Sequence, residues 1–226
     1  YSDYDKDKAP MRAIFERYIQ KCETIIPGRT ILAVGAATGY VLDIAKKRGW
    51  KTFGSELSSY AADVASMRGH QMIRGTLTEV ETLPHVDAVM MWDVLEHVDD
   101  PRAYVMAVGT MLPPGGVFMI GTPDTSSLWA RLMGMRWQLI VPPEHLFYYS
   151  PANLSRLLNE CGFDVKEIAK PSKRFSLPYV FNILAQWQKL SLWRFLSRAT
   201  DNRLFRSFAL PINLRDNMFL IAIKRA

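Results

Sequence analysis

Cysteine is scarce in this chain, and long runs of apolar residues are missing. The two cysteines among 226 residues, Cys22 and Cys161, lie far apart and outside any CxxC arrangement. That spacing offers neither a zinc ribbon nor a disulfide framework, so we expect two reduced thiols in a cytoplasmic protein. No apolar stretch approaches the roughly 18 residues of a membrane-spanning helix. The polar start, YSDYDKDKAP, also lacks the apolar region of a signal peptide.

Acidic residues are scarce in the C-terminal quarter. Residues 171–226 hold ten lysines and arginines but only Asp201 and Asp216, which gives this segment a net charge of +8 within a chain of +6. The basic character therefore belongs to this quarter and not to the whole protein. An apolar helical face precedes the arginines and is formed by Val180, Ile183, Leu184, Trp187 and Leu190.

Three interpretations of this basic quarter remain open. The first is a helical lid that packs over the domain and has a solvated basic rim. The second is a membrane-surface contact through residues 173–206 that serves a lipid-like acceptor. The third is a site for an anionic or nucleic-acid substrate, but the tryptophan and leucine content favours lipid over RNA. No RNA-binding module is readable, so nucleic acid is not an expected partner.

Helix and strand patterns alternate along most of the chain. A helix is predicted over 10–25, with Ile14, Tyr18, Ile19 and Ile25 near one face. Further predicted helices span 39–48, 57–68, 101–112 and 153–161, and predicted strands span 30–35, 51–55, 71–75, 86–92, 117–122, 163–169 and 217–225. This alternation predicts an open, mostly parallel α/β sheet with helices on both faces. Residues 178–207 are predicted to form a helical insertion with a break near Ser191.

The loop after the first predicted strand is the best candidate for a ligand site, because open α/β sheets bind ligands at the carboxyl ends of their strands. Gly35 allows a sharp turn off the strand, and Gly39 allows the next helix to start close to the sheet. Glu56 follows at the end of the second strand. A carboxylate in that position can accept both hydroxyls of a ribose.

Four segments carry a resemblance to a known family. They are ILAVGAATGYVLDIAKKRGWKTFGSEL, VDAVMMWDVLEHVDDP, LPPGGVFMIGTP and NLRDNMFLIAIKR. In this order they resemble the motifs of class I S-adenosylmethionine-dependent methyltransferases, closest to the ubiquinone-pathway O-methyltransferase-like group. The resemblance implies a Rossmann-like, doubly wound sheet of seven strands in the order 3-2-1-4-5-7-6, with the last strand antiparallel.

The resemblance also implies a domain plan and a cofactor site. One methyltransferase-like domain would span 1–226, with an N-terminal helix in 1–28, a cofactor-binding core in 29–170, a helical insertion or lid in 171–216 and the last strand in 217–226. The implied S-adenosylmethionine ligands are Gly35, Ala37, Thr38 and Gly39 for the methionine part, Glu56 for the ribose, Leu57, Thr76 and Leu77 for the adenine, and Trp92 and Asp93 to close the site.

Two positions depart from the family pattern. Ala33 stands where the first motif usually has an acidic residue, and Ala37 stands where it usually has a middle glycine. The acid orders the methionine end of the cofactor, and the extra methyl group of Ala37 crowds the backbone approach. A non-catalytic binding or regulatory protein on the same fold is therefore one alternative function. A membrane-surface interaction protein that works through 173–206 is a second alternative.

An acidic and imidazole cluster follows the fourth predicted strand. If a helical turn begins at Asp93, its carboxylate points the same way as Glu96 and His97. The segment resembles the E-V-x-E-H motif of ubiquinone-pathway O-methyltransferases and small-RNA 2′-O-methyltransferases, which contributes ligands to a divalent ion together with a downstream His. His145 is the candidate for that histidine.

Two uses of this cluster remain open. Asp93, Glu96, His97 and His145 could bind a divalent metal such as Mg²⁺, which would lower the pKa of a substrate hydroxyl. Without a metal, His97 or His145 could act as the general base. We expect a methyltransferase that acts on an oxygen, or else a nitrogen, of a small or lipid-like acceptor. Its oligomeric state is left open, and its location is expected to be cytoplasmic or peripheral to a membrane.

Overall fold

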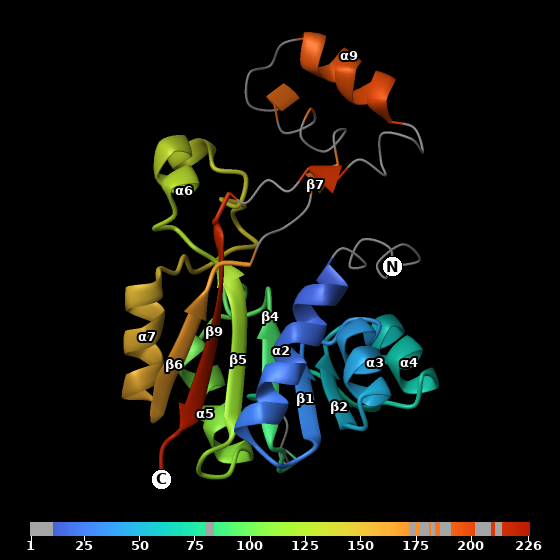
Figure 1. Cartoon of the computed structure of the whole chain (residues 1–226), viewed down its shortest axis with the longest axis vertical. Coiled ribbons are helices and arrows are strands. Elements are labelled where there is room, and N and C mark those ends of the chain that lie inside the picture. The colour runs from blue at the N-terminus through green and yellow to red at the C-terminus, as the bar shows by residue number, and fades with distance from the viewer. Residues whose placement is uncertain are drawn as a thin grey trace.

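A seven-stranded sheet forms the centre of the molecule (Figure 1). The computed structural model describes residues 11–79, 84–171, 175–176, 181, 184–185, 191–201, 209–210 and 214–226. The strands are β1 (Thr30–Val34), β2 (Lys51–Glu56), β3 (Gln71–Arg74), β4 (Ala88–Trp92), β5 (Val117–Pro123), β6 (Phe163–Ala169) and β9 (Asn217–Lys224). Their order is β3-β2-β1-β4-β5-β9-β6, which confirms the order that the family resemblance implies.

The register of the sheet brings the ends of β1, β2 and β4 together. β1 pairs in parallel with β2 and with β4, so that Val34 lies beside Ser55 and beside Met91. β5 continues the parallel part, and β9 runs antiparallel between β5 and β6. Carboxyl ends of parallel strands form one edge of a sheet, which is where such folds bind ligands.

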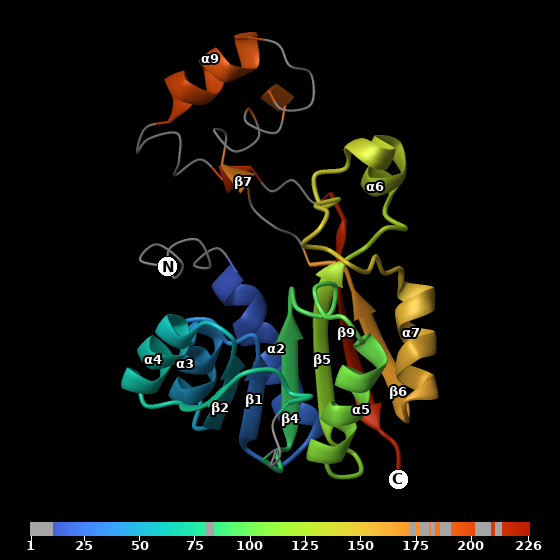
Figure 2. The ribbon, with the colours of Figure 1, turned by 180° about the vertical axis from the view of Figure 1, so that it is seen from behind.

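Helices cover both faces of the sheet, as Figures 1 and 2 show from opposite sides. On one face, α2 (Arg12–Ile25) and α3 (Tyr40–Lys47) pack on inward residues such as Ile31 and Met90. On the other face, α5 (Pro101–Met111) and α7 (Pro151–Glu160) pack on residues such as Leu32 and Met91. Successive strand residues alternate between the faces, so both sides of these strands are apolar. α4 (Ser59–Met67) packs on β2 and β3.

The buried face of α2 differs from the predicted one. Phe15, Tyr18, Ile19 and Cys22 are its buried residues, whereas Ile25 is exposed. These four positions repeat at i, i+3, i+4 and i+7, which is one helical stripe. The prediction was right for Tyr18 and Ile19 but missed Phe15, which turns out to face the candidate site. Both cysteines are free thiols, as expected.

The segment after β5, for which the sequence predicts no element, contains two short helical turns. It forms a short helix α6 (Leu128–Met133) and a 3-10 turn η2 (Gly134–Arg136). The side-chain hydroxyl of Ser127 accepts a hydrogen bond from the Ala130 N–H at 3.1 Å and caps α6.

The predicted helical insertion is described only in part. α9 (Ser191–Thr200) is a helix that begins at the predicted break, and β7 (Phe175–Ser176) pairs antiparallel with β8 (Ala209–Leu210). Of the predicted apolar face, Leu184 is described, whereas Val180, Ile183, Trp187 and Leu190 lie outside the described residues. None of the helices in the described ranges is both long enough and apolar enough to cross a bilayer.

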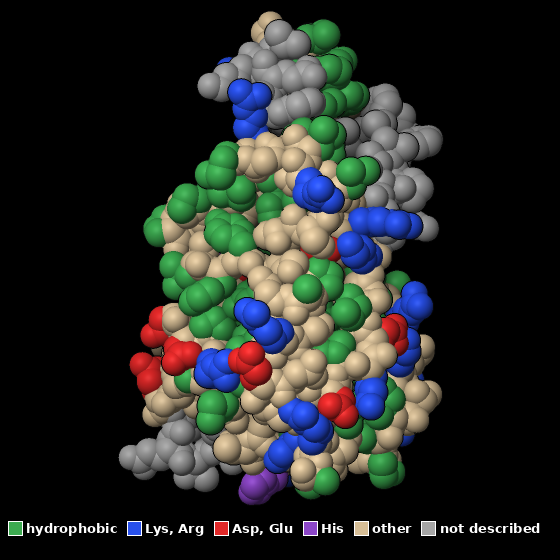
Figure 3. Space-filling view, turned by 90° about the vertical axis from the view of Figure 1, so that its left-hand side faces the viewer, with side chains coloured by type: hydrophobic (Ala, Val, Ile, Leu, Met, Phe, Trp, Pro, Cys, Tyr) green, Lys and Arg blue, Asp and Glu red, His purple; other side chains and the backbone are tan. Residues whose placement is uncertain are grey.

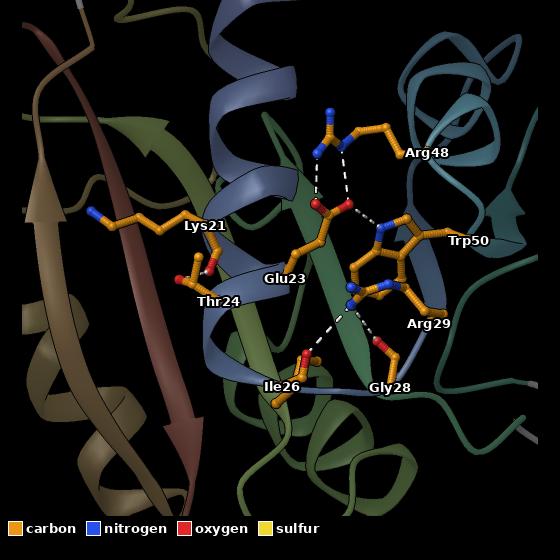
Figure 4. Close-up of polar contacts among 8 residues, drawn as sticks. All are labelled: Lys21, Glu23, Thr24, Ile26, Gly28, Arg29, Arg48 and Trp50. Atoms are coloured by element: carbon orange, nitrogen blue, oxygen red, sulfur yellow. Dashed lines mark hydrogen bonds and ion pairs between the residues drawn. The ribbon is translucent and has the colours of Figure 1, made fainter.

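A polar clamp joins the C-terminal part of α2 to the end of α3 and to Trp50, which directly precedes β2 (Figure 4). The Glu23 carboxylate accepts hydrogen bonds from Arg48 Nε at 3.0 Å and Nη2 at 2.6 Å, and from Trp50 Nε1 at 3.0 Å. The hydrogen bonds from Arg48 are the main reason that the pKa of Glu23 lies below its usual range; burial opposes them, and Trp50 adds to the lowering. The clamp holds α2 in place, and α2 carries Phe15, which faces the candidate site.

Candidate active site

The loop after β1 turns sharply at two glycines. Gly35 has φ +65° and Gly39 has φ +87°, in the left-handed region that favours glycine. A Cβ on Gly35 would lie 2.5 Å from Cγ2 of Val94, and a Cβ on Gly39 would lie 2.8 Å from Cδ2 of His70. The loop is therefore packed against the segment after β4 on one side and against a buried histidine on the other.

Glu56 lies at the end of β2 and is tied to this loop. Its carboxylate accepts the Ala37 N–H at 2.8 Å through one oxygen and the Ser58 N–H at 2.9 Å through the other. A carboxylate offers about four lone-pair positions, so these two bonds leave acceptor capacity for a pair of hydroxyls. The geometry fits the ribose-binding role that the resemblance implies for Glu56.

A small hollow of about 30 Å³ lies beside the loop. Phe15, Ala33, Gly35, Tyr40 and Trp92 are among the residues that line it. Ala33 occupies the position of the missing family acid, so its short side chain leaves part of this space open. The indole Nε1 of Trp92 is buried, and no acceptor for its hydrogen exists among the described residues. A polar group of a ligand in this hollow would satisfy that donor.

The other predicted cofactor residues differ in their surroundings. Thr38 is buried in the loop, and Leu57 is 71% exposed just beyond Glu56, where it can cover a flat ring. Leu77 instead packs in the hydrophobic core, and Thr76 donates its hydroxyl hydrogen to Glu79. Trp92 packs edge-on against Phe15, with ring centroids 5.0 Å apart, so it forms a wall of the hollow.

The structure brings Glu96, His97 and His145 together. One ligand atom of each lies within 4.8 Å of the others, and the two imidazole centroids are 4.6 Å apart. Glu96 is 1% exposed, and one carboxylate oxygen accepts the hydroxyl hydrogen of Thr122 at 2.9 Å. Residues nearly 50 positions apart in sequence thus form one polar cluster above the end of β4.

Backbone carbonyls fix the tautomers of both histidines. Nδ1 of His97 lies 2.8 Å from the Glu144 carbonyl oxygen, and Nδ1 of His145 lies 2.8 Å from the Leu139 carbonyl oxygen. A carbonyl oxygen can only accept, so each Nδ1 carries a proton. In the neutral rings, the lone pair is then on Nε2, which can take a proton or coordinate a metal ion.

Hydrogen bonds between the two loops hold this cluster in place. The Glu96 carbonyl oxygen accepts the N–H groups of Leu146 at 2.8 Å and Phe147 at 3.1 Å. The buried hydroxyl of Tyr149 donates to the Leu95 carbonyl oxygen at 3.3 Å. Burial raises the pKa of Tyr149, so it stays a protonated donor. These hydrogen bonds fix the loop that carries His145 against the turn that carries Glu96.

Asp93 does not join the cluster, contrary to the prediction. Its φ is +51°, its N–H donates to the Gly121 carbonyl oxygen, and the chain forms a turn at 95–97 instead of a helix that starts at Asp93. The left-handed residue rotates the chain between the strand end and the turn. Among the described residues, the metal-competent set is therefore Glu96, His97 and His145.

Sequence reasoning missed several residues that shape the site. Thr122 orients Glu96, and Phe15 and Tyr40 line the hollow. His70 supports Gly39 from behind: its Nε2–H donates to Asp43 at 3.1 Å, and its Nδ1 accepts from the Thr52 hydroxyl at 2.8 Å. Burial is the main reason that the pKa of His70 is lowered. The i, i+3, i+4, i+7 stripe of α2 was the one available signal, and it pointed to Phe15.

Comparison with known proteins gives consistent matches. A family model described as a methyltransferase domain matches residues 6–168. Ubiquinone biosynthesis O-methyltransferases from Alkalilimnicola ehrlichii and Nitrosospira multiformis are 28% and 26% identical over 67% and 63% of this chain. The matches span only about two thirds of these relatives, 67% and 66% of their lengths.

A solved structure supports the fold. Magnesium protoporphyrin IX methyltransferase from Synechocystis, with bound S-adenosylhomocysteine, superimposes with a TM-score of 0.64 and 12% identity over 97% of this chain and 85% of that one. At this identity the likeness concerns the fold alone. Together with the family match over most of the sequence, it leads to one conclusion. The chain belongs to the methyltransferase-domain family and has the fold of the S-adenosylmethionine-dependent methyltransferases.

Proposed function

We propose that the chain transfers a methyl group from S-adenosylmethionine to an oxygen of a lipid-like acceptor. The observation that supports this proposal most directly is the cluster of His97 and His145 beside buried Glu96. It lies at the carboxyl end of β4, next to the glycine loop. Methyl transfer to oxygen needs a group that removes or weakens the hydroxyl proton, and an imidazole with its lone pair on Nε2 suits that task. A nitrogen acceptor that is already a neutral amine has a free lone pair for the attack and depends less on such a group.

The loop and Glu56 would hold the cofactor. Backbone N–H groups at the start of α3 favour a negatively charged group, and Glu56 offers its remaining lone pairs to ribose hydroxyls. Leu57 would cover the adenine, and Trp92 Nε1 would donate to a polar group at the methionine end. When bound, S-adenosylmethionine supplies an electrophilic methyl group, and positioning the acceptor in line with it provides most of the rate.

The histidines would handle the acceptor hydroxyl. Nε2 of His145 or His97 accepts the proton, and the carbonyl that faces each Nδ1–H keeps the ring in the required tautomer. In the alternative with a metal, Glu96, His97 and His145 would hold a divalent ion that lowers the pKa of the hydroxyl. The set of one carboxylate and two imidazoles fits such an ion. One oxygen of Glu96, however, already accepts a hydrogen bond from the Thr122 hydroxyl. We therefore favour the general-base form.

The acceptor class follows from the relatives and from the composition. The relatives are named for ubiquinone biosynthesis, and ubiquinone precursors are lipid-like. The proposed organisation is one domain over 1–226, in which the core of 29–170 binds the cofactor and the insertion of 171–216 covers the acceptor. The proposal places the protein in the cytoplasm, at the periphery of a membrane.

Calorimetric titration with S-adenosylhomocysteine tests the cofactor site. We expect micromolar binding by the unmodified chain, and at least a tenfold loss of affinity in Glu56→Ala, because that change removes the ribose acceptor and the tie to Ala37. Glu160→Ala on α7 is the matched control and should bind normally. A well-folded chain that binds neither S-adenosylhomocysteine nor S-adenosylmethionine would contradict the proposal and favour a non-catalytic role.

Turnover measured with a panel of hydroxyl-bearing, lipid-like acceptors then distinguishes the general-base form of the proposal from the metal-binding form. His145→Asn and His97→Asn should keep cofactor binding, and loss of the general base should lower turnover by roughly 10²–10⁴-fold. Chelation by EDTA should leave turnover unchanged in the general-base form. Loss on chelation, with recovery on addition of Mg²⁺, would assign the cluster to a metal instead.

A further inference from the structure

α6 presents an apolar stripe to solvent. Leu128 and Leu132 are 82% and 71% exposed, and their spacing of i and i+4 places them on one side of α6; Met135, in η2 directly after it, is 85% exposed. Large aliphatic side chains with this exposure, aligned in a row, are unusual on a surface that contacts only water.

The opposite side of this segment is anchored, so the stripe is held outward. Ala130, Met133 and Trp137 form a small buried cluster of their own. The indole Nε1 of Trp137 and the Gln138 amide both donate to the Asp216 carboxylate, at 3.2 Å and 2.9 Å. Asp216 lies directly before β9, so the central sheet fixes the orientation of the segment.

A second exposed stripe lies on α9. Leu192 and Phe195 are 55% and 67% exposed, whereas Ser197 on the other side is buried. Trp193 faces inward and stacks on Phe181, with ring centroids 5.9 Å apart. α9 thus repeats the pattern of α6, with one anchored side and one apolar side toward solvent.

Basic side chains predominate around these stripes, and the exposed acidic residues Glu144 and Asp201 lie just beyond the two segments. Arg131 and Arg136 are exposed beside the first stripe, and Arg194 and Arg198 beside the second. No acidic residue occurs in 125–143 or in 191–200. Figure 3 shows the same division on the face that includes α6 and α7: its exposed acidic side chains lie in the lower half, and hydrophobic and basic side chains dominate the upper half.

Both stripes lie at the end of the molecule that carries the candidate site. α6 and α9 extend beyond the carboxyl ends of the parallel strands in both ribbon views (Figures 1 and 2). We define the docking face as Leu128, Leu132 and Met135 with Leu192 and Phe195, together with Arg131, Arg136, Arg194 and Arg198.

We infer that the docking face binds the surface of an anionic phospholipid bilayer. The aliphatic and aromatic side chains would enter the boundary between headgroups and acyl chains, while the arginines keep their guanidinium groups at the anionic headgroups. A protein partner of matching charge would need acidic groups set between apolar ones; a bilayer of anionic lipid offers both at once. The inference rests on the proposed function in one respect, the delivery of a lipid-like acceptor from the membrane.

Co-sedimentation of the whole chain with large vesicles tests the docking face. The vesicles contain either phosphatidylcholine alone or phosphatidylcholine with 30% phosphatidylglycerol, at low and at high salt. We expect binding to the anionic vesicles, weakening at high salt because the arginine contribution is screened. Leu132→Ser with Met135→Ser, and separately Arg131→Gln with Arg136→Gln, should each lower the partition coefficient at least tenfold.

Matched controls separate the docking face from general surface effects. Met67→Ser removes an equally exposed apolar side chain at the end of α4, and Arg156→Gln removes an exposed arginine from α7. Both should bind vesicles as the unmodified chain does. Calorimetric binding of S-adenosylhomocysteine should be unchanged in every variant, which also shows that the variants are folded.

Three results would overturn the inference. They are an unmodified chain that binds no anionic vesicles, equal binding to neutral and anionic vesicles, and a serine variant that changes only self-association in analytical ultracentrifugation. The last result would identify the face as a contact between copies of this chain. Vesicle binding without cofactor binding would instead contradict the proposed function and leave the docking face intact.

Discussion

At the residue scale, the absence of a Cβ at Gly35 allows the turn that shapes the candidate site. Its backbone has φ +65°, and a Cβ would overlap with Val94. The strand β1 ends just before this turn, so any shift in the loop would move the backbone donors away from the cofactor. Gly49 offers a comparison, because its φ is +85° and nothing lies within 4 Å of the Cβ position.

Gly35→Ala should therefore weaken cofactor binding much more than Gly49→Ala. We expect Gly35→Ala to lower S-adenosylhomocysteine affinity at least tenfold and to cost about 1–3 kcal/mol of unfolding free energy, since it adds a steric clash to backbone strain. Gly49→Ala should cost about 1 kcal/mol from strain alone. Calorimetry and urea unfolding measure the two effects. Similar losses of affinity in both variants would refute this account of the loop.

Residue identity predicts much of the site but not its contacts. Gly35, Gly39 and Glu56 were recognisable because the turn and the carboxylate depend on residue type and spacing. Asp93 was misplaced, because a left-handed φ at an aspartate is set by the packing of its surroundings. The hydrogen bond from Thr122 to Glu96 joins β5 to the turn after β4 and has no local signature in the sequence.

At the element scale, the attachment of α2 depends on the Glu23 clamp shown in Figure 4. Glu23 is partly buried and accepts charged hydrogen bonds from Arg48, which lower its pKa. A carboxylate with a lowered folded pKa stabilises the protein above the unfolded pKa of about 4.3. That stability is lost as the pH falls through the folded value.

Glu23→Gln should thus destabilise the chain in a pH-dependent way. At pH 7 we expect a loss of about 1–3 kcal/mol of unfolding free energy, the usual contribution of hydrogen bonds to charged groups. At about pH 3, below the unfolded pKa of about 4.3, the difference between the two proteins should shrink, because the stability that the lowered pKa supplies is lost as the pH falls toward and through the folded value. Urea unfolding at both pH values measures this. Glu16→Gln, in an exposed pair with Arg12 on the same helix, should have a much smaller effect; an equal loss at pH 7 and pH 3 would show that the charge is unimportant.

Elements were predictable where the hydrophobic pattern was long. The strands and the main helices appear within a few residues of their predicted bounds, since buried parallel strands and amphipathic helices have distinct periods. α6 was not predicted, because its six residues are too few to show a helical period. β7 and β8 have two residues each, so they are defined by their pairing and not by sequence.

At the scale of the whole molecule, the antiparallel strand β9 connects β6 to the rest of the sheet. β9 supplies five core residues that are at most 1% exposed, Met218 to Ala222. It is also the strand on which β6 pairs. The family resemblance predicted this topology, whereas the alternation of helices and strands alone would not have distinguished an antiparallel insertion.

A chain that ends at Asp216 should lose cooperative folding. Removing β9 exposes the apolar sides of β5 and β6 and leaves β6 without its partner, so we expect no cooperative thermal transition by circular dichroism. A control that ends at Lys224 keeps the whole of β9 and should unfold cooperatively. If the chain that ends at Asp216 melts like the control, β9 is dispensable for the core.

The position of β9 also has a consequence for synthesis on the ribosome. The parallel strands β1 to β5 emerge first and can assemble while translation continues, but the gap beside β5 can be closed only after residues 217–224 have left the exit tunnel. Until then β6 and the apolar edge of β5 are open to other unfinished chains. Nascent protein therefore passes through a stage at which a chaperone has a defined surface to shield, and that stage ends when the last strand is released.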